Sequence, residues 1–311
     1  MKKIAVIGTG VIGSGWIIRF LAHNKKVIAY DKDTKLKKKI ISEIKRTWPH
    51  VKKLFNKKNI KLKDFKFTTS LKEAIKDADF IQECAPENYK LKIKLMNEIG
   101  KYAKLNSIIS SSSSGLLPSR IYSKCKNPSR TIIAHPFNPV YLLPGVELVP
   151  GNKTKNIFLK KAQKFYKSIS MNPIMVKKEL PGYLADRLQE ALWREALHII
   201  NEGYGSTQDL DRSIEDGPGL RWSLMGTFLT FHLAGGKEGM KHMLEQFGPA
   251  LKLPWTKLKA PKLSKKLSSR VIKGTKLQSK GKSVELISNI RDEYLVDLQK
   301  LRKKYENKLR K

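Results

Sequence analysis

Three glycines near the N-terminus restrict the fold of this chain more than any other feature of its sequence. They are Gly8, Gly10 and Gly13, in the spacing G-x-G-x-x-G. Residues 3–7 precede them as an apolar, β-branched run, which is typical of a buried strand. Residues 12–22 then have the pattern of a helix, and a second apolar run, residues 27–30, ends at Asp31. Strand, glycine turn, helix and strand therefore follow one another as in a dinucleotide-binding βαβ unit.

Each glycine has a physical task in such a unit. Gly8 permits the tight turn from strand to helix, Gly10 lets a pyrophosphate approach the backbone, and Gly13 lets the helix pack closely on the strand. The amides of Val11 and Ile12 lie at the positive end of the helix dipole, where they would hold the phosphates. An ordinary βαβ unit would leave three such closely spaced glycines unexplained.

The residue that ends the second strand predicts which dinucleotide binds. A carboxylate at Asp31 would accept both hydroxyls of the adenosine ribose and repel a 2′-phosphate. We therefore expect NAD as the cofactor. NADP remains the alternative, because Lys32 and Lys35 would meet a 2′-phosphate if Asp31 turned away.

The order of the later elements predicts the fold class. Strand and helix patterns alternate as far as residue 180, and only helical patterns follow. This order predicts an α/β fold, in which an N-terminal Rossmann-type, doubly wound parallel sheet precedes an all-helical C-terminal domain. We expect an NAD-binding domain at residues 1–180 and a helical substrate and dimerisation domain at residues 181–311. The expected strands are residues 3–7, 27–30, 65–69, 79–85, 107–112, 131–134, 146–149 and 174–176.

Two basic stretches are less regular in their pattern. Residues 34–58 have helical spacing, but Pro49 should break or kink them, so we expect an inserted helical pair. Residues 262–282 contain Ser and Gly among many lysines. We expect them to form a mobile surface segment before a last helix at residues 284–305.

The charge of the chain raises the question of nucleic-acid binding. The 311 residues carry a formal net charge of +36, and 51 of the 63 basic residues are lysines spread over nearly every polar face. Aromatic residues do not alternate with them as base-stacking platforms, and no known nucleic-acid-binding motif occurs. We therefore expect a solvated basic surface and no specific nucleic acid partner.

Cysteine content and hydropathy indicate whether the chain has disulfides, a metal site or a membrane span. Cys84 and Cys125 are too few for a disulfide framework, and they form no C-x-x-C pair that would suggest a metal site. No apolar run of the sequence is long enough to span a membrane. We therefore expect a cytoplasmic protein with no metal and no membrane partner.

Three side chains suited to alcohol oxidation stand where this fold brings strand ends to the cofactor. Ser114 lies in the serine-rich turn after the fifth strand, His135 ends the sixth, and Glu147 belongs to the seventh. His135 would take the substrate hydroxyl proton, and Glu147 would orient the imidazole and stabilise its cation. Ser114 and Asn138 would hydrogen-bond the substrate or the ring. Taken singly, these residues also fit a helix cap, a buried structural histidine and a surface acid.

Several motifs resemble those of the 3-hydroxyacyl-CoA dehydrogenase family over residues 1 to about 255. They are GTGVIGSG, IQECAPEN, a Ser-x-x-Ser pair before Gly115, HPFNP and the glutamate of VELVPG. The resemblance implies that Ser114, His135 and Glu147 form the catalytic set. It also implies that Glu87 and Lys92 contact the cofactor and that the helical domain forms a homodimer interface.

One segment departs from the family pattern. Where the family has Gly-Phe-x-x-Asn-Arg-Leu beside the substrate, this chain reads GYLADRL, with Asp186 in place of the asparagine. The chain is most similar to family members that act on carnitine, through stretches in both domains such as HPFNPVYLLP and DRLQEALWREAL. Carnitine is a 3-hydroxy acid with a quaternary ammonium at C4, so its permanent cation would complement Asp186. In the competing interpretation, Asp186 pairs with Arg187 or Arg194 and only supports the fold.

We therefore expect NAD-dependent oxidation of the C3 hydroxyl of a carnitine-like 3-hydroxy acid to the ketone. Arg194 or Arg221 would hold the substrate carboxylate. Trp222 is one of several aromatic candidates, of which one or two would face the ammonium group while the others belong to the core of the helical domain. A 3-hydroxyacyl-CoA or sugar-acid dehydrogenase is the alternative, although Asp186 would then face an uncharged or anionic group. A protein that kept the fold and lost catalysis is disfavoured by the intact catalytic set.

Overall fold

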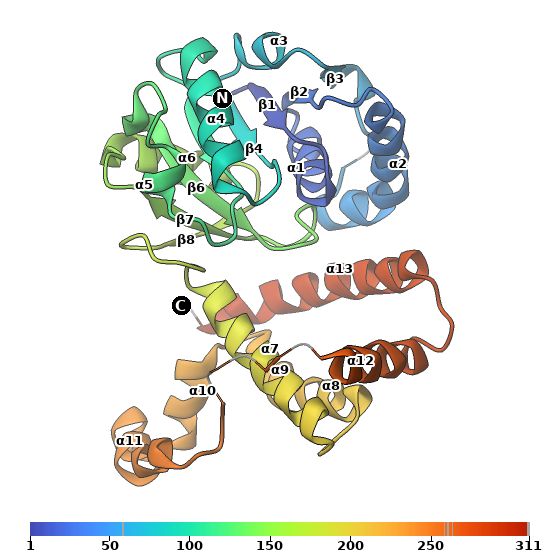
Figure 1. Cartoon of the computed structure of the whole chain (residues 1–311), viewed down its shortest axis with the longest axis vertical. Helices are drawn as coiled ribbons and strands as arrows, with labels where there is room; N and C mark the ends of the chain where they lie inside the picture. Colours follow the sequence, from blue (N-terminus) through green and yellow to red (C-terminus); the bar gives the residue numbers. More distant parts are fainter. Residues whose placement is uncertain (58, 258, 260, 263, 310–311) are drawn as a thin grey trace. The chain divides into compact units, whose positions relative to one another are not determined.

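The structure, a computed structural model, describes residues 1–57, 59–257, 259, 261–262 and 264–309 (Figure 1). The chain divides into two compact units, residues 1–187 and residues 188–311. Unit 1 contains the sheet, and unit 2 is helical. The expected boundary after residue 180 precedes this division by one short turn and the start of a helix, and it stays a prediction.

Unit 1 is built on a single eight-stranded sheet with the strand order β3-β2-β1-β4-β5-β6-β7-β8. Every neighbouring pair is parallel except β6 and β7. That pair is antiparallel because only residues 137–144 connect its strands, which is too short for the crossover that parallel strands need. The predicted fold class is confirmed. The strands are β1 (Lys3–Ile7), β2 (Lys26–Tyr30), β3 (Phe65–Thr68), β4 (Phe80–Glu83), β5 (Ile108–Ser111), β6 (Thr131–Pro136), β7 (Gly145–Pro150) and β8 (Asn172–Met175).

Helices cover both faces of the sheet in unit 1. One face packs against α3 (Leu71–Ile75), α4 (Tyr89–Tyr102) and α5 (Pro118–Ile121), whose buried side chains join those of the strands in one apolar cluster. The other face packs against α1 (Val11–Ala22) and α6 (Asn156–Lys167) through a run of stacked and tilted aromatic rings. Central strands β4, β5 and β6 are consequently buried along their whole length. Their apolar residues belong to the core, and polar residues near their carboxyl ends, such as Glu83, Ser111 and His135, are buried with them.

The predicted helical pair at residues 34–58 is wrong. Residues Leu36–Phe55 form one helix, α2, with Pro49 inside it, and residue 58 lies outside the described residues. Proline removes one backbone donor from a helix. Ile40, Ile44 and Val51 are fully buried on one face of α2. Their burial offsets the lost hydrogen bond, so packing overrides the local preference of proline.

The described residues of unit 2 are mainly helical. Its first helix, α7 (Ala185–Glu202), begins at the end of unit 1. The others are α8 (Thr207–Glu215), α9 (Pro218–Trp222), α10 (Thr227–Ala234), α11 (Met240–Phe247), α12 (Lys265–Gln278) and α13 (Val284–Leu309), with 3-10 turns η3 (Gly236–Glu238) and η4 (Gly248–Lys252). None of the described helices is both long and apolar enough to span a membrane.

The expected mobile segment at residues 262–282 is also wrong for the residues that the structure describes, because most of them form α12. Leu267 is fully buried, and Arg270 donates hydrogen bonds to the carbonyls of Ile200 and Asn201 at 3.1 and 2.8 Å. Gly274 lies against Thr207, where a Cβ atom would come within 2.5 Å of the Thr207 hydroxyl. These contacts bind α12 to its neighbours despite its polar composition. Residue 263, at the start of the predicted segment, lies outside the described residues.

Candidate active site

The glycine turn after β1 has the geometry that a bound dinucleotide requires. Gly8 has a φ of +93°, and a Cβ atom there would lie 2.8 Å from the carbonyl oxygen of Cys84. Gly13 lies against the carbonyl of Gly8, where no side chain fits. Around Gly10, in contrast, no heavy atom lies within 4 Å of the place that a Cβ would take. The backbone at Gly10 is therefore open to a ligand.

The N-terminus of α1 faces the same turn. Gly10 is its N-cap and supplies no side chain to cap the helix, and Val11 is 72% exposed. The first amides of a helix have no partner within it, so an anion can accept hydrogen bonds from them. An open backbone next to such a helix terminus fits the pyrophosphate of NAD, with Gly10, Val11, Ile12 and Gly13 as the residues that would hold it.

Asp31 is tied to the glycine turn through Thr9. One carboxylate oxygen, Oδ2, accepts the Thr9 amide at 2.8 Å and the Thr9 hydroxyl at 2.7 Å, and Oδ1 accepts the Lys32 amide at 2.8 Å. Three donors thus hold the carboxylate at the end of β2, beside the turn. Thr9 was not among the residues predicted from the sequence, although a hydroxyl directly after the first glycine is the signal that points to it.

Glu87 and Lys92 form an ion pair, with Lys92 Nζ 3.6 Å from Glu87 Oε2, and each also binds a second part of the fold. Glu87 accepts a hydrogen bond from Ser113 Oγ and from the amides of Ser114 and Gly115, at 3.1 and 3.3 Å for the amides. It therefore holds the serine turn that follows β5. Lys92 is buried, and its ammonium donates to both oxygens of Glu83, at 2.8 and 3.0 Å. The cofactor contacts implied for Glu87 and Lys92 stay predictions.

His135 and Glu147 are directly opposite each other on the antiparallel strands β6 and β7. His135 Nδ1 lies 2.8 Å from Glu147 Oε2, and both side chains are buried. Because a carboxylate accepts only, Nδ1 is the protonated nitrogen and Nε2 is left as an acceptor. A neutral imidazole of this tautomer can receive a proton at Nε2.

The second oxygen of Glu147 binds the start of α7. Oε1 accepts the amides of Leu184 and Ala185, at 2.9 and 3.0 Å. Burial alone would raise the pKa of Glu147, but the hydrogen bonds from His135 and from these two amides outweigh it and hold the pKa below its ordinary value. Glu147 is therefore an anion at neutral pH, as a group that stabilises an imidazolium must be.

Asp186 stands at the other side of the imidazole. Its Oδ1 lies 3.8 Å from His135 Nε2, and about a third of the Asp186 side chain is exposed. The nitrogen that is free to take a proton is thus the one beside this second carboxylate. A cationic substrate that reached Nε2 would come close to Asp186.

The remaining predicted residues of unit 1 lie at the same edge of the sheet. Ser114 is exposed in the turn after β5, and β5 pairs in parallel with β6, which carries His135 near its end. Asn138 is exposed and follows β6. Carboxyl ends of adjacent parallel strands form the usual ligand-binding edge of such a sheet.

Arg194, Arg221 and Trp222 belong to unit 2. Arg194 forms an ion pair with Glu190, one turn earlier on α7, with Nε and Oε1 2.9 Å apart. Arg221 and Trp222 are exposed at the end of α9. Their predicted contacts with the substrate stay predictions.

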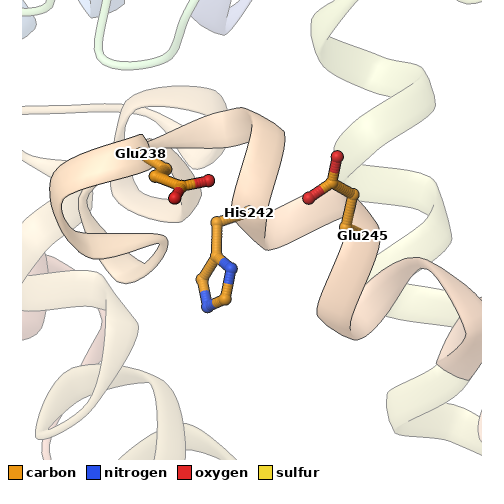
Figure 2. Close-up of side chains that lie close together, drawn as sticks. All are labelled: Glu238, His242 and Glu245. Atoms are coloured by element: carbon orange, nitrogen blue, oxygen red, sulfur yellow. The ribbon is translucent and has the colours of Figure 1, made fainter.

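Unit 2 also carries three exposed side chains of the kinds that bind metal ions. Glu238 on η3 and His242 and Glu245 on α11 bring one ligand atom each to within 4.8 Å of the others (Figure 2). His242 and Glu245 are three residues apart, so they lie on one side of the helix. Lys237 and Lys241 directly precede Glu238 and His242 in the sequence. Solvent-exposed groups with cations as neighbours do not form a built metal site.

The chain is similar to known dehydrogenases over nearly its whole length. The 3-hydroxyacyl-CoA dehydrogenase NAD binding domain matches residues 3–180, and the C-terminal domain of the same family matches residues 182–274. The L-carnitine dehydrogenase of Oceanobacillus iheyensis is 50% identical over 96% of this chain and 97% of its own length. Those of Bacillus cereus and Pseudomonas putida are 47% and 46% identical over 98% and 95% of this chain, and 94% and 92% of their own lengths.

Solved structures share the fold. The chain superimposes with a TM-score of 0.82 on 5-formyl-3-hydroxy-2-methylpyridine 4-carboxylic acid 5-dehydrogenase, at 21% identity over 97% of this chain and 99% of that one. The TM-score is 0.63 for (S)-3-hydroxybutyryl-CoA dehydrogenase from Ralstonia eutropha, at 24% identity over 79% and 85% of the two chains. The match to the NAD binding domain and the similarity to the dehydrogenase relatives confirm NAD as the cofactor and the oxidoreductase class. Matches to both family domains, in order and across most of its length, show that this chain belongs to the 3-hydroxyacyl-CoA dehydrogenase family.

Proposed function

We propose that this enzyme oxidises the C3 hydroxyl of L-carnitine to the ketone, 3-dehydrocarnitine, with NAD as the hydride acceptor. The observation that carries the proposal is the arrangement of His135 between two carboxylates, Glu147 at 2.8 Å and Asp186 at 3.8 Å. One carboxylate suits a proton-accepting histidine, and the other suits a substrate with a permanent positive charge. Relatives named L-carnitine dehydrogenase at 45–50% identity support the same substrate.

The proton of the substrate hydroxyl passes to His135. Glu147 holds the imidazole through Nδ1, so Nε2 accepts the proton and the resulting imidazolium lies against an anion. Ser114 and Asn138 orient the hydroxyl so that its proton faces Nε2. Bound NAD would supply the acceptor for the C3 hydrogen as hydride, so that the hydride and the hydroxyl proton held at His135 Nε2 together account for the two-electron oxidation.

The cofactor is held by unit 1. Gly8, Gly10 and Gly13 with Val11 and Ile12 receive the pyrophosphate, and Asp31 accepts hydrogen bonds from the adenosine ribose. Glu87 and Lys92 are the further residues that we propose for contact with the cofactor. The fixed carboxylate of Asp31 disfavours the 2′-phosphate of NADP through charge repulsion.

Substrate recognition uses the two charged ends of carnitine. Asp186 attracts the quaternary ammonium. Because this group has no N–H to donate, the site recognises it by charge and shape and not by hydrogen bonds. Trp222 contributes an aromatic face to the same group. Arg194 or Arg221 binds the carboxylate of the substrate.

The test of this function is a substrate panel followed by NADH absorbance. L-carnitine should be oxidised with NAD, while 3-hydroxybutyrate, 3-hydroxybutyryl-CoA and a sugar acid should have a kcat/KM at least about tenfold lower, the difference that one lost charge contact makes. D-carnitine is the matched control, since it differs only in configuration at C3. A higher kcat/KM with the acyl-CoA would assign the enzyme to the alternative substrate class.

We propose further that two copies of the enzyme associate through unit 2, in the cytoplasm. Among the described residues of unit 2, the buried apolar side chains are Leu197, Ile200, Leu267 and Val296. Many larger ones are exposed, among them Phe228 at 85%, Leu251 at 86% and Trp255 at 72%. Such an apolar surface on a small core is typical of a subunit interface. Light scattering should give twice the mass of one chain, and a value for one chain would refute the dimer.

A further inference from the structure

Tyr183 lies between the elements that carry the predicted catalytic residues. It immediately precedes Leu184 and Ala185, whose amides bind Glu147. Its side chain is fully buried, and its hydroxyl donates a hydrogen bond to the carbonyl of Leu116 at 2.7 Å. Leu116 follows Ser114 by two residues, in the serine turn.

The ring of Tyr183 also packs on the imidazole of His135. The two ring centroids are 5.8 Å apart, and the planes are inclined by 59°. This geometry lies within the range in which aromatic rings attract one another. A single side chain therefore contacts both the histidine and the serine turn, and its own backbone leads directly into the amides that hold the glutamate.

The backbone at Tyr183 is unusual for an aromatic residue. Its φ is +43°, in the left-handed region, and it follows Gly182 at a φ of +71°. A residue with a side chain is strained in this region, because its Cβ atom comes too close to the following carbonyl oxygen. Such strain persists where the surroundings over-determine the conformation, and it concentrates at functional sites. The left-handed turn directs the next two amides at Glu147 Oε1.

We propose that Tyr183 is a positioning residue, which holds the serine turn and the His135–Glu147 pair in one fixed relation. It acts through Leu116 and His135 and does not itself exchange a proton with the substrate. Burial raises the pKa of the Tyr183 phenol well above its ordinary value, so the hydroxyl remains a donor throughout the working pH range. This inference rests on the proposed function, because positioning matters only if the set is catalytic.

The test compares Tyr183→Phe with Tyr122→Phe. Tyr122 is buried too, and its hydroxyl donates to the carbonyl of Ile132. Both variants thus lose one buried hydroxyl-to-carbonyl hydrogen bond, and only the first loses it at the serine turn. We expect Tyr183→Phe to lower kcat about two- to tenfold, the effect of one such hydrogen bond, with the KM for NAD unchanged. Tyr122→Phe should lower the melting temperature equally and leave kcat at the wild-type value.

A second measurement needs no substrate. Hydrogen exchange of the peptide that contains residues 113–117 should be about two- to tenfold faster in Tyr183→Phe than in the wild type, because local opening of the turn costs less. Tyr122→Phe should leave that peptide unchanged. Equal kcat and equal exchange in the two variants would overturn the proposal.

The two proposals fail in different ways. If the wild-type enzyme oxidises another 3-hydroxy acid instead of L-carnitine, the substrate assignment fails, and the two variants are compared with that acid. If the wild type oxidises L-carnitine and Tyr183→Phe equals Tyr122→Phe in both measurements, only the positioning role fails.

Discussion

Asp186 Oδ1 lies 3.8 Å from His135 Nε2, so the nitrogen that faces the substrate has a carboxylate beside it. The opposite nitrogen, Nδ1, is already bound to Glu147. A histidine with one carboxylate partner needs no second anion to accept a proton. The second anion is explained if the substrate brings a positive charge of its own.

Replacing Asp186 by Asn should weaken L-carnitine binding without altering the shape of the site. At a separation of about 6 Å and an effective dielectric of about 20, the lost attraction is roughly 3 kcal/mol before desolvation and screening. The net effect should be a KM about tenfold higher. Activity on 3-hydroxybutyrate, a smaller substrate that lacks the ammonium group, is the control and should not fall. Equal losses on both substrates would show that Asp186 serves His135 or the fold instead of the ammonium group.

His135→Gln should lower kcat by about 10²–10⁴, the usual contribution of a positioned acid–base group. Binding of NAD, followed by fluorescence titration, should be nearly unchanged. His23→Gln is the matched control, since His23 is hydrogen-bonded to the carbonyl of Arg19 and to Ser170 Oγ, away from the carboxyl edge of the sheet. It should reduce stability and leave kcat near the wild-type value. A His135 variant with normal kcat would remove this residue from the reaction.

Glu147→Gln should change how the free energy of unfolding depends on pH. Because the folded-state pKa of Glu147 is below its unfolded value of about 4.3, its stabilising contribution is complete above that value. The contribution is lost as the pH falls through the folded-state pKa. Urea unfolding at pH 6 and at pH 3 should therefore show a larger acid loss in the wild type than in the variant. Identical losses would mean that Glu147 is not held as an anion.

Asp31→Ser should narrow the preference for NAD over NADP by about tenfold, because the repulsion of the 2′-phosphate disappears. The measurement is kcat/KM for each cofactor at a saturating substrate concentration. Thr9→Val supplies a second comparison, since it removes one of the three donors that fix the carboxylate and keeps its charge. It should change the preference less than Asp31→Ser does. A wild-type enzyme that used both cofactors equally would contradict the role of Asp31.

Lys92→Met should destabilise unit 1 by about 3–5 kcal/mol, because it leaves the buried carboxylate of Glu83 without its cation. The double variant Lys92→Met, Glu83→Gln should lose clearly less, since no isolated charge is then buried. Urea unfolding monitored by circular dichroism gives both values. A double variant as unstable as the single one would mean that the ion pair is not the source of the effect.

Much of unit 1 followed from the sequence because its signals are local. Each of the eight strands has at least two large apolar residues within its four to six positions, and a turn with three glycines fixes the first βαβ unit. The helical pair predicted around Pro49 and the mobile segment predicted at residues 262–282 were wrong for the same reason. In both segments, buried contacts with other helices outweigh the local preference of the residues.

The finer structure of the site depends on contacts between distant residues, which no local pattern contains. The hold of Thr9 on Asp31 spans 22 positions, and that of Leu184 on Glu147 spans 37. His135 and Glu147 adjoin because an eight-residue connection makes β7 run back beside β6. The pairing of His135 with Glu147 could be predicted from their chemistry. The position of Tyr183 could not, because it depends on the path of the folded chain.

The hydrogen bonds from Leu184 and Ala185 to Glu147 determine where the chain can be cut to make a fragment or joined to make a chimera. A fragment that stops at residue 180, where the match to the NAD binding domain stops, keeps the whole sheet and omits both donors. Such a fragment would retain the nucleotide fold, but Glu147 Oε1 would lack both of its amide donors. A chimera that exchanges helical domains between relatives should therefore be joined after Arg187, so that the sheet keeps the seven residues that complete its active-site edge.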